Sequence, residues 1–290
     1  MLEYKYRFDA LGTKWVIETN DEINSFLKTT IQNRIEEFDK VYSRFRVDSL
    51  ITKVAKKSGE YLFPQDAKKL FDFYKNLYVL TNGKITPLIG DMISRAGYDA
   101  VYSLKPQLQE PVPAWDEATH WNDVTLTTSQ QITLDVGAAG KGYMIDIIAA
   151  ILDEHSVDDY IVDASGDLRH KGAGENIVGL EDPLDSSKVI GTVEVINRSL
   201  CASASNRRAW GDGMHHILDP TKIAPTKDII ATWVIAEEAM VADGLATALF
   251  FVDAKKLCDY DFEYVRMYAN GSVEYSTYFE KKLFKKLDAT

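Results

Sequence analysis

One ten-residue segment, 134–143 (LDVGAAGKGY), constrains the fold more than any other part of this chain. An apolar, strand-like run ends at Asp135, and three glycines and Lys141 follow before an amphipathic helix begins. Glycine lets the backbone approach a ligand closely, the N-terminus of a helix offers unpaired N–H groups to anions, and a lysine adds a point charge for phosphate. The spacing matches neither the dinucleotide-binding nor the P-loop pattern. The segment therefore predicts either a phosphorylated ligand at a strand-to-helix turn or a tight turn with a surface lysine.

Length, charge and cysteine content narrow the class of protein. The 290 residues are 46% hydrophobic, which is ordinary for a globular protein. The net charge of −11 argues against nucleic acid or an anionic membrane as a partner. Two cysteines provide neither a disulfide framework nor a cysteine-based metal site.

The N-terminal sequence lacks the features of an export signal. It has no basic region, no apolar run and no lipid-attachment cysteine. No run of about 18 apolar residues, the length that spans a bilayer, occurs in the chain. We therefore expect no membrane insertion by this chain and a cytoplasmic location. An exported, membrane-anchored protein is the alternative if a leader has been removed.

Helical and strand-like apolar periods alternate along the chain, which predicts an α+β (mixed α/β) fold with mixed sheets flanked by helices. No repeat or linker divides the sequence, so we expect a single domain over residues 1–290. Residues 103–122 contain three prolines and are expected to form a surface excursion. Residues 253–290 are expected to form a C-terminal hairpin and tail, with the hairpin turn at Asn270-Gly271.

Apolar spacing also places the individual elements. One helix is expected to be capped by Asn20 or Asp21 and to continue to about Val41, and others are expected over about 67–81, 141–151 and 237–251. Expected strands are 6–18 with a bend at Gly12, a hairpin over 124–136, and single strands over 159–164, 176–180 and 189–197.

Two adjacent histidines, His215 and His216, precede Asp219-Pro220. Neighbouring side chains of a strand point to opposite faces, so one of the two is expected to face a site. A neutral histidine can accept a proton from a hydroxyl nucleophile near pH 7. The alternative is a solvated pair before a turn.

Asp243 and Thr247 lie four residues apart within the last expected helix, so their oxygens share one face. A carboxylate with a hydroxyl suits Mg²⁺, completed by carbonyls, water and phosphate. Asp243 lies within an apolar stretch, where a carboxylate needs a partner or an ion. The alternative is an aspartate on the wet edge of an amphipathic helix.

Two further segments carry possible binding chemistry. Residues 201–208 contain small hydroxyl side chains followed by Arg207 and Arg208, which could hold a phosphate or form a solvated loop. Residues 43–49 place Phe45 between two arginines at the end of the first helix. This aromatic side chain could stack on a ring or belong to the core.

Seven motifs stand in a fixed order between about Phe8 and Val252, and in this order the chain resembles the FAD:protein FMN transferases, also called the ApbE family. The motifs are Leu11-Gly12-Thr13; Ser43-Arg44-Phe45 with Asp48-Ser49; Thr86-Pro87-Leu88 with Gly97-Tyr98; Leu134-Asp135-Val136-Gly137 with Gly140-Lys141-Gly142-Tyr143; Ser165-Gly166-Asp167; His216-Ile217-Leu218-Asp219-Pro220; and Ala242-Asp243-Gly244-Leu245-Ala246-Thr247.

The resemblance implies that FAD is the substrate and that its FMN moiety passes to a Thr or Ser hydroxyl of a target flavoprotein, with release of AMP. It implies His216 as the base that accepts the hydroxyl proton. It implies Mg²⁺ bound by Asp243, Thr247 and the carbonyl of Ala138. The FAD-binding residues that it implies are Leu11, Ser43, Arg44, Phe45, Ala96, Gly97, Tyr98, Asp135 and Lys141.

Two alternatives remain open: an FAD pyrophosphatase that yields FMN and AMP, and a non-enzymatic FAD-binding protein. The chain also departs from the family pattern. Ala96-Gly97-Tyr98 stands where Trp-Gly-Phe is usual, so the loss of a flat stacking surface is expected. Ser203-Ala204-Ser205 and Lys222-Ile223 also differ from the usual residues.

Overall fold

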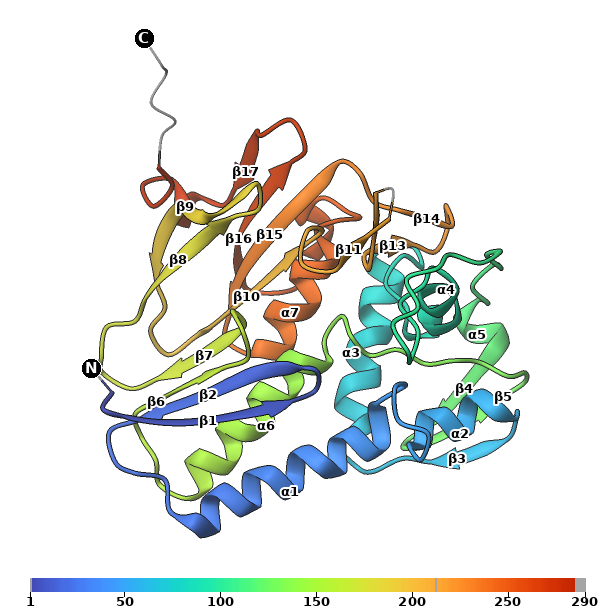
Figure 1. Ribbon diagram of the computed structural model, residues 1–290, viewed down its shortest axis with the longest axis horizontal. Helices are drawn as coiled ribbons and strands as arrows, with labels where there is room; N and C mark the ends of the chain where they lie inside the picture. Colours follow the sequence, from blue (N-terminus) through green and yellow to red (C-terminus); the bar gives the residue numbers. More distant parts are fainter. Residues whose placement is uncertain (1, 212, 285–290) are drawn as a thin grey trace.

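The computed structural model describes residues 2–211 and 213–284. Its largest sheet has eight strands in the order β1-β2-β6-β7-β10-β15-β16-β17, and helices α6 and α7 pack on one face of it (Figure 1). The expected α+β fold is confirmed. Every strand pairing among the described residues is antiparallel, so the expected mixture of strand directions is wrong.

The strands form one large sheet and four small ones. The large sheet contains β1 (Tyr4–Ala10), β2 (Thr13–Thr19), β6 (Tyr160–Asp163), β7 (Leu168–Lys171), β10 (Ser199–Ala204), β15 (Ile229–Ala236), β16 (Phe262–Tyr268) and β17 (Val273–Tyr275). The small sheets are β3 (Glu60–Leu62) with β5 (Thr125–Thr128) and β4 (Thr119–Asn122); β8 (Ile177–Asp182) with β9 (Asp185–Glu194); β11 (Ala209–Trp210) with β12 (Met214–His215); and β13 (Leu218–Asp219) with β14 (Ala224–Pro225).

The helices lie between and beside these sheets. They are α1 (Ser25–Tyr42), α2 (Leu50–Lys56), α3 (Ala67–Leu80), α4 (Gly90–Arg95), α5 (Trp115–Ala118), α6 (Gly140–Glu154) and α7 (Ala239–Ala248), with short 3₁₀ turns at Pro87–Ile89, Ala254–Leu257 and Thr277–Phe279. Among the described residues no helix has the length and apolar character that crossing a bilayer requires.

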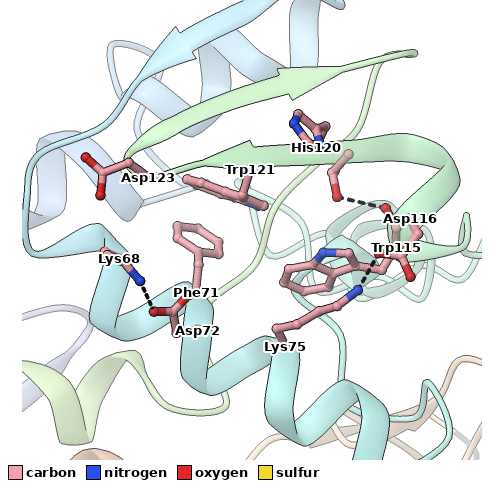
Figure 2. A pocket seen from close by; sticks show the side chains of 10 residues that line it. Lys68, Phe71, Asp72, Lys75, Trp115, Asp116, His120, Trp121 and Asp123 are labelled. Carbon is pink, nitrogen blue, oxygen red and sulfur yellow. Dashed lines mark hydrogen bonds and ion pairs between the residues drawn. The ribbon is translucent and has the colours of Figure 1, made fainter.

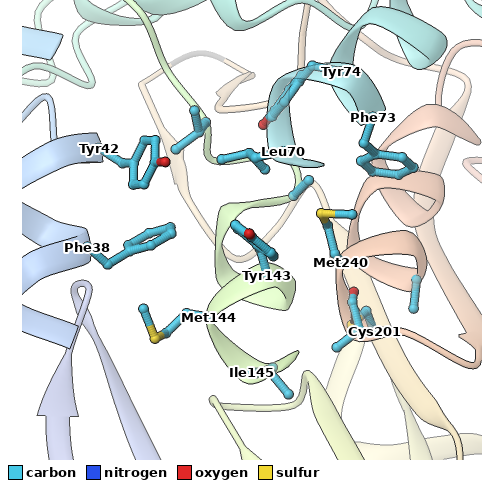
Figure 3. Close-up of a cluster of buried hydrophobic side chains, with 14 of the residues drawn as sticks. Phe38, Tyr42, Leu70, Phe73, Tyr74, Tyr143, Met144, Ile145, Cys201 and Met240 are labelled. Atoms are coloured by element: carbon cyan, nitrogen blue, oxygen red, sulfur yellow. Dashed lines mark hydrogen bonds between the residues drawn. The ribbon is translucent and has the colours of Figure 1, made fainter. Parts of the chain in front are cut away.

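The large sheet is covered by apolar side chains on both faces. On one face the helices α1, α3, α6 and α7 meet around Phe38, Tyr143 and Met240 (Figure 3). On the other face the β8–β9 hairpin covers a second cluster. Strand β15 contributes side chains to both clusters, because Val234 belongs to the first cluster and Trp233 to the second.

A buried carboxylate fixes α7 relative to α6. Asp146 of α6 accepts hydrogen bonds from the backbone N–H groups of Ala239 (2.9 Å) and Met240 (2.8 Å), the first two residues of α7. These N–H groups have no partner within the helix, and a negative charge is favourable at a helix N-terminus. The helix that carries Asp243 is therefore positioned by the helix that begins at Gly140.

Two expectations for the N-terminal region are wrong. The expected bent strand over 6–18 is the antiparallel hairpin β1–β2, whose two-residue turn has positive φ at Leu11 (49°) and Gly12 (73°), as the tightest hairpins require. The first helix is capped by Asn24, whose side chain accepts from the N–H of Leu27, and not by Asn20 or Asp21. Local sequence did not discriminate among these three polar residues.

The expected hairpin over 124–136 is also wrong. Strand β5 pairs with β4, which precedes it, and residues 132–136 are an extended segment outside the strands. That segment is held by hydrogen bonds from the N–H of Asp135 to the carbonyl of Pro87 (2.7 Å) and from the N–H of Gly90 to the carbonyl of Thr133 (3.1 Å). Its apolar side chains are buried against the helices, which accounts for their strand-like alternation.

The proline-containing segment 103–122 divides into two parts. Residues 103–114 contain no regular element, as expected of a surface excursion, but α5 and β4 follow, and Trp115 is buried. The C-terminal hairpin turns at Asn270-Gly271 as expected. Its strands β16 and β17 extend the large sheet, so this hairpin belongs to the main fold, and residues 285–290 of the expected tail lie outside the described part.

Candidate active site

The strand-to-helix turn before α6 is joined to the end of α1. Asp135 accepts a hydrogen bond from the N–H of Gly137 (2.7 Å) through Oδ1 and from Nε of Arg44 (2.5 Å) through Oδ2. Arg44 also donates to the hydroxyl of Ser94 (3.2 Å) and the carbonyl of Tyr98 (2.8 Å). One buried guanidinium thus brings together three segments that the sequence assigned to FAD binding.

Four aromatic side chains, Phe45, Tyr98, Tyr102 and Trp210, form a cluster beside this guanidinium, which lies 4.2 Å from the ring centroid of Phe45. Phe45 and Tyr102 are stacked with an interplanar angle of 3°, and Tyr98 stacks on Trp210. An aromatic cluster therefore lies beside Ala96-Gly97-Tyr98, although the usual Trp is absent from that segment. The indole of Trp210 comes from β11, and its Nε1 donates to the carbonyl of Ala96 (2.9 Å).

Gly97 is needed for the loop that carries Tyr102. Its φ is +108°, and a Cβ there would lie 2.8 Å from the backbone of Leu104 and Lys105. The Gly97 carbonyl accepts from the N–H of Leu104 (2.9 Å), which closes the loop over Phe45. Ser43, the remaining predicted residue of this region, is the C-cap of α1.

Lys141 is not a free cation. Its Nζ forms an ion pair with the buried carboxylate of Asp167 and lies 3.4 Å from the carbonyl of Ala164. Burial acts to lower the pKa of Lys141, but the charges of Asp167 and Asp243 outweigh it and raise the pKa. Leu11 lies at the same end of the sheet, since the Thr13 hydroxyl two residues on donates to the hydroxyl of Ser165 (2.7 Å).

Oxygen atoms gather where α7 approaches the start of α6. Asp243 is buried, and its Oδ2 accepts from the N–H of Gly142 (2.9 Å). The hydroxyl of Thr247 lies 3.4 Å from that of Ser203 on β10. Burial and the negative charge of Asp167 raise the pKa of the Asp243 carboxyl well above its usual range, although Lys141 opposes this rise. Asp243 is thus a buried acid that lacks sufficient positive charge.

The two histidines are not paired within a strand, because His215 is the last residue of β12 and His216 follows it in a bend. His215 is buried and structural, because its Nε2–H donates to the carbonyl of Thr226 (2.8 Å) and its Nδ1 accepts from the N–H of Ile217 (3.2 Å). The Nδ1 of His216 is buried without a hydrogen-bond partner among the described residues. Burial, followed by the charges of Arg208 and His215, lowers the pKa of His216 to about 3, so it is neutral at pH 7.

Comparison with known proteins identifies the family. The family model described as "ApbE family" matches residues 11–263, which is most of the chain. The chain belongs to the ApbE family.

Curated relatives are similar over most of their length. An FAD:protein FMN transferase of Buchnera aphidicola is 23% identical over 87% of this chain and 81% of the relative. An FAD:protein FMN transferase of Haemophilus influenzae is 25% identical over 87% and 78%. Solved structures support the fold. ApbE of Thermotoga maritima has a TM-score of 0.85 at 21% identity, and the match covers 97% of this chain and 99% of that one. The flavin transferase ApbE of Vibrio cholerae has a TM-score of 0.82 at 20% identity, with the same coverage.

In this ApbE-family chain the structure brings most of the predicted residues together. Arg44 contacts Asp135, the carbonyl of Tyr98 and the ring of Phe45. The charge of Asp167 acts on both Lys141 and Asp243. Ala138 lies in the turn immediately before α6. Asp167 was not among the predicted site residues, and Arg208 was named only as one of two arginines that could hold a phosphate or form a solvated loop. Asp167 stands in a quoted motif at the end of an apolar strand, a signal that could have identified it.

A separate hollow of about 230 Å³ lies between α3 and β4 (Figure 2). It has an aromatic floor that includes Phe71 and Trp121, and its rim lysines, Lys68 and Lys75, are paired with Asp72 and Asp116. None of its lining residues belongs to the predicted site. The hollow is therefore distinct from the oxygen and aromatic clusters of this ApbE-family chain.

Proposed function

We propose that this protein is an FAD:protein FMN transferase that moves the FMN moiety of FAD to a Thr or Ser hydroxyl of a target flavoprotein and releases AMP. The observation that carries the proposal is the neutral His216, whose buried Nδ1 has no hydrogen-bond partner among the described residues, in a fold that also buries the acid Asp243 with a raised pKa. The names of the curated relatives support the same activity.

The donor set of the oxygen cluster fits a hard divalent cation. Among residues 2–211 and 213–284 no group of three or more His, Cys, Asp or Glu side chains could hold a metal by itself. A cation here would need the Asp243 carboxylate, the Thr247 hydroxyl, a backbone carbonyl such as that of Ala138, and substrate phosphate. The raised pKa of Asp243 is the electrostatic condition that an added cation would relieve. When bound, Mg²⁺ would neutralise charge on the phosphates of FAD.

The reaction needs a proton acceptor beside the attacking hydroxyl. The hydroxyl oxygen forms a bond to the phosphorus of the FMN half, and the bond from that phosphorus to the bridging oxygen breaks. The bridging oxygen leaves with AMP, and the hydroxyl proton passes to His216. A neutral imidazole with a free nitrogen can take that proton, and the approach of anionic phosphates would raise its pKa from the low value that burial and Arg208 impose.

The aromatic cluster supplies a surface for the rings of FAD. Phe45 and Tyr102 are partly exposed. Phe45 lies beside the Arg44 guanidinium, and Tyr102 stacks on Phe45. Stacking on such rings stabilises a planar ligand. The Asp135–Arg44 pair would keep this surface at a constant distance from the turn before α6.

The alternatives predict different products. A pyrophosphatase would use water as the nucleophile and release free FMN, and a binding protein would leave FAD intact. Neither is favoured, because the relatives with this fold are named transferases. A binding protein also has no need for a neutral histidine that can accept a proton.

Mass spectrometry of a small Thr-containing flavoprotein domain, incubated with this protein, FAD and Mg²⁺, tests the proposal. We expect a mass increase equal to an FMN phosphoester, lost with EDTA and in Asp243→Asn. The control variant Asp72→Asn, which alters an exposed carboxylate of the separate hollow, should label the acceptor as the wild-type protein does. Free FMN and AMP without labelling would support the pyrophosphatase, and unchanged FAD and acceptor would support the binding protein.

A further inference from the structure

We propose that Arg208 is a further catalytic residue of this protein, with a guanidinium that binds the diphosphate of FAD between Tyr98 and His216. This inference rests on the proposed function, because it names the group that meets the negative charge of that substrate. Arg208 lies in the turn between β10, which supplies Ser203 to the oxygen cluster, and β11, which supplies Trp210 to the aromatic cluster.

The other cations of the site are already neutralised. Arg44 is paired with Asp135, and Lys141 is paired with Asp167. The raised pKa of Asp243 keeps this carboxyl largely protonated at pH 7, so it adds little charge to these two balanced pairs. A diphosphate would therefore meet no uncompensated positive charge from Arg44 or Lys141.

Arg208 is the available cation. It forms no ion pair with any residue among 2–211 and 213–284, and its side chain is exposed, so a ligand can reach it. Its neighbour Arg207 differs, because Arg207 is paired with Glu181 at 2.8 Å. The two adjacent arginines therefore differ, because among the described residues Arg207 has an ion-pair partner and Arg208 has none.

The position of Arg208 places it at the reacting centre. Its Cζ lies 5.4 Å from the ring centroid of Tyr98, whose carbonyl is held by Arg44. The turn that carries Arg208 joins Ser203, whose hydroxyl lies 3.4 Å from that of Thr247, to Trp210, which stacks on Tyr98. The guanidinium thus lies on the aromatic surface, in the turn that leads there from the oxygen cluster.

A guanidinium suits this task for geometric reasons. Its planar fork can donate two parallel hydrogen bonds to phosphate oxygens. In phosphoryl transfer an arginine that meets the charge spread over the transferred group accelerates the reaction strongly. Arg208 would contact the phosphate oxygens as the bond to the bridging oxygen breaks, and it would leave the proton transfer to His216.

The test compares Arg208→Gln with the matched control Arg207→Gln. We expect Arg208→Gln to weaken FAD binding, measured by flavin fluorescence, by about tenfold or more, and to slow FMN transfer by about a hundredfold or more. Riboflavin, which has no diphosphate, should bind both variants equally. Arg208→Lys keeps the charge without the fork and should recover part of the loss.

The outcomes separate this inference from the proposed function. FAD affinity and transfer rate in Arg208→Gln within twofold of those in Arg207→Gln would overturn the role of Arg208 and leave the transferase standing. If the wild-type protein binds FAD but labels no acceptor, the proposed function fails, and the affinities of the two variants still decide whether Arg208 binds the diphosphate. If the wild-type protein does not bind FAD, both fail. Thermal melting of each variant checks that the fold is intact.

Discussion

The backbone N–H of Gly142 donates a 2.9 Å hydrogen bond to Oδ2 of Asp243, which joins the first turn of α6 to the middle of α7. The two helices can approach this closely only because residue 142 has no side chain. A Cβ at Gly142 would lie 2.2 Å from the carbonyl oxygen of Ala239 and 2.8 Å from Cβ of Asp243. The contact sets the position of the acid on which the proposed cation site depends.

Gly142→Ala should therefore destabilise the protein. A methyl group forced against backbone costs about 3 kcal/mol because the helices must separate, and the free energy of unfolding in urea measures this loss. Gly174→Ala is the control, since a Cβ there meets nothing within 4 Å. Equal stability of the two variants would show that α6 and α7 separate at little cost.

Arg44→Gln should destabilise the fold and weaken FAD binding together. Its side chain is 5% exposed and that of Asp135 is 15% exposed, and breaking such a buried pair by removing one partner costs about 3 kcal/mol. The control is Arg46→Gln, two residues away, whose ion pairs with Glu36, Asp39 and Asp48 are more exposed to solvent and should contribute less. Thermal melting and FAD titration of both variants test the difference. Preserved FAD affinity in Arg44→Gln would argue against its role in positioning the aromatic cluster.

Asp243 should make the metal-free protein less stable as pH rises. The folded carboxyl has a raised pKa, so between the ordinary value and about 8 the folded state binds a proton that the unfolded state has lost. Stability therefore falls as pH increases through this window, and Asp243→Asn should flatten the decrease. Added Mg²⁺ should raise the melting temperature more at pH 8 than at pH 5, because it displaces that proton. Melting curves that respond to Mg²⁺ equally at both pH values would argue against Asp243 as a ligand.

The two histidines should respond differently to substitution. His216→Ala should reduce FMN transfer by about a hundredfold or more while FAD binding persists, because it removes only the proton acceptor. His215→Ala should instead lower the melting temperature, because it leaves the Thr226 carbonyl and the Ile217 N–H without their partner. Transfer assays and melting curves on both variants distinguish these roles. Unchanged transfer in His216→Ala would overturn its assignment.

The low pKa of His216 should make the stability of the protein depend on pH in the acid range. Between about pH 6.5 and pH 3 the unfolded state binds a proton that the buried, neutral imidazole does not. The wild-type protein should therefore lose stability as pH falls through this window, and His216→Ala should lose less. An identical acid dependence in the two proteins would show that this imidazole is accessible to protons in the folded state.

Elements with their own apolar period were predicted well. The helices at 67–80 and 140–154 follow from side chains spaced for a single buried face. Residues 132–136 were wrongly predicted as a strand, because a buried extended segment held by Pro87 and Gly90 shows the same alternation as a strand. Alternation reports which side chains are buried and does not report which backbone accepts the hydrogen bonds.

The site was predictable where its chemistry lies within one short segment. Asp243 and Thr247 share a helix face, and the glycines and Lys141 share a turn, so their residue types and spacing alone indicated an anion and a cation. Trp210, which lies over Ala96, and Asp167, which pairs with Lys141, come from distant parts of the chain. Their partners could not be found from local pattern.

The sequence by itself determined the α+β composition, the order of the motifs and the residue types that suit a diphosphate and a hard cation, because these follow from short-range spacing and side-chain chemistry. The tertiary structure alone decided which charges remain uncompensated. Pairing of Lys141 with Asp167 and of Arg44 with Asp135 neutralises two of the cations that the sequence indicated. Coulomb energy depends on distance and burial, so only packing could leave Arg208 and Asp243 without an ion-pair partner among residues 2–211 and 213–284.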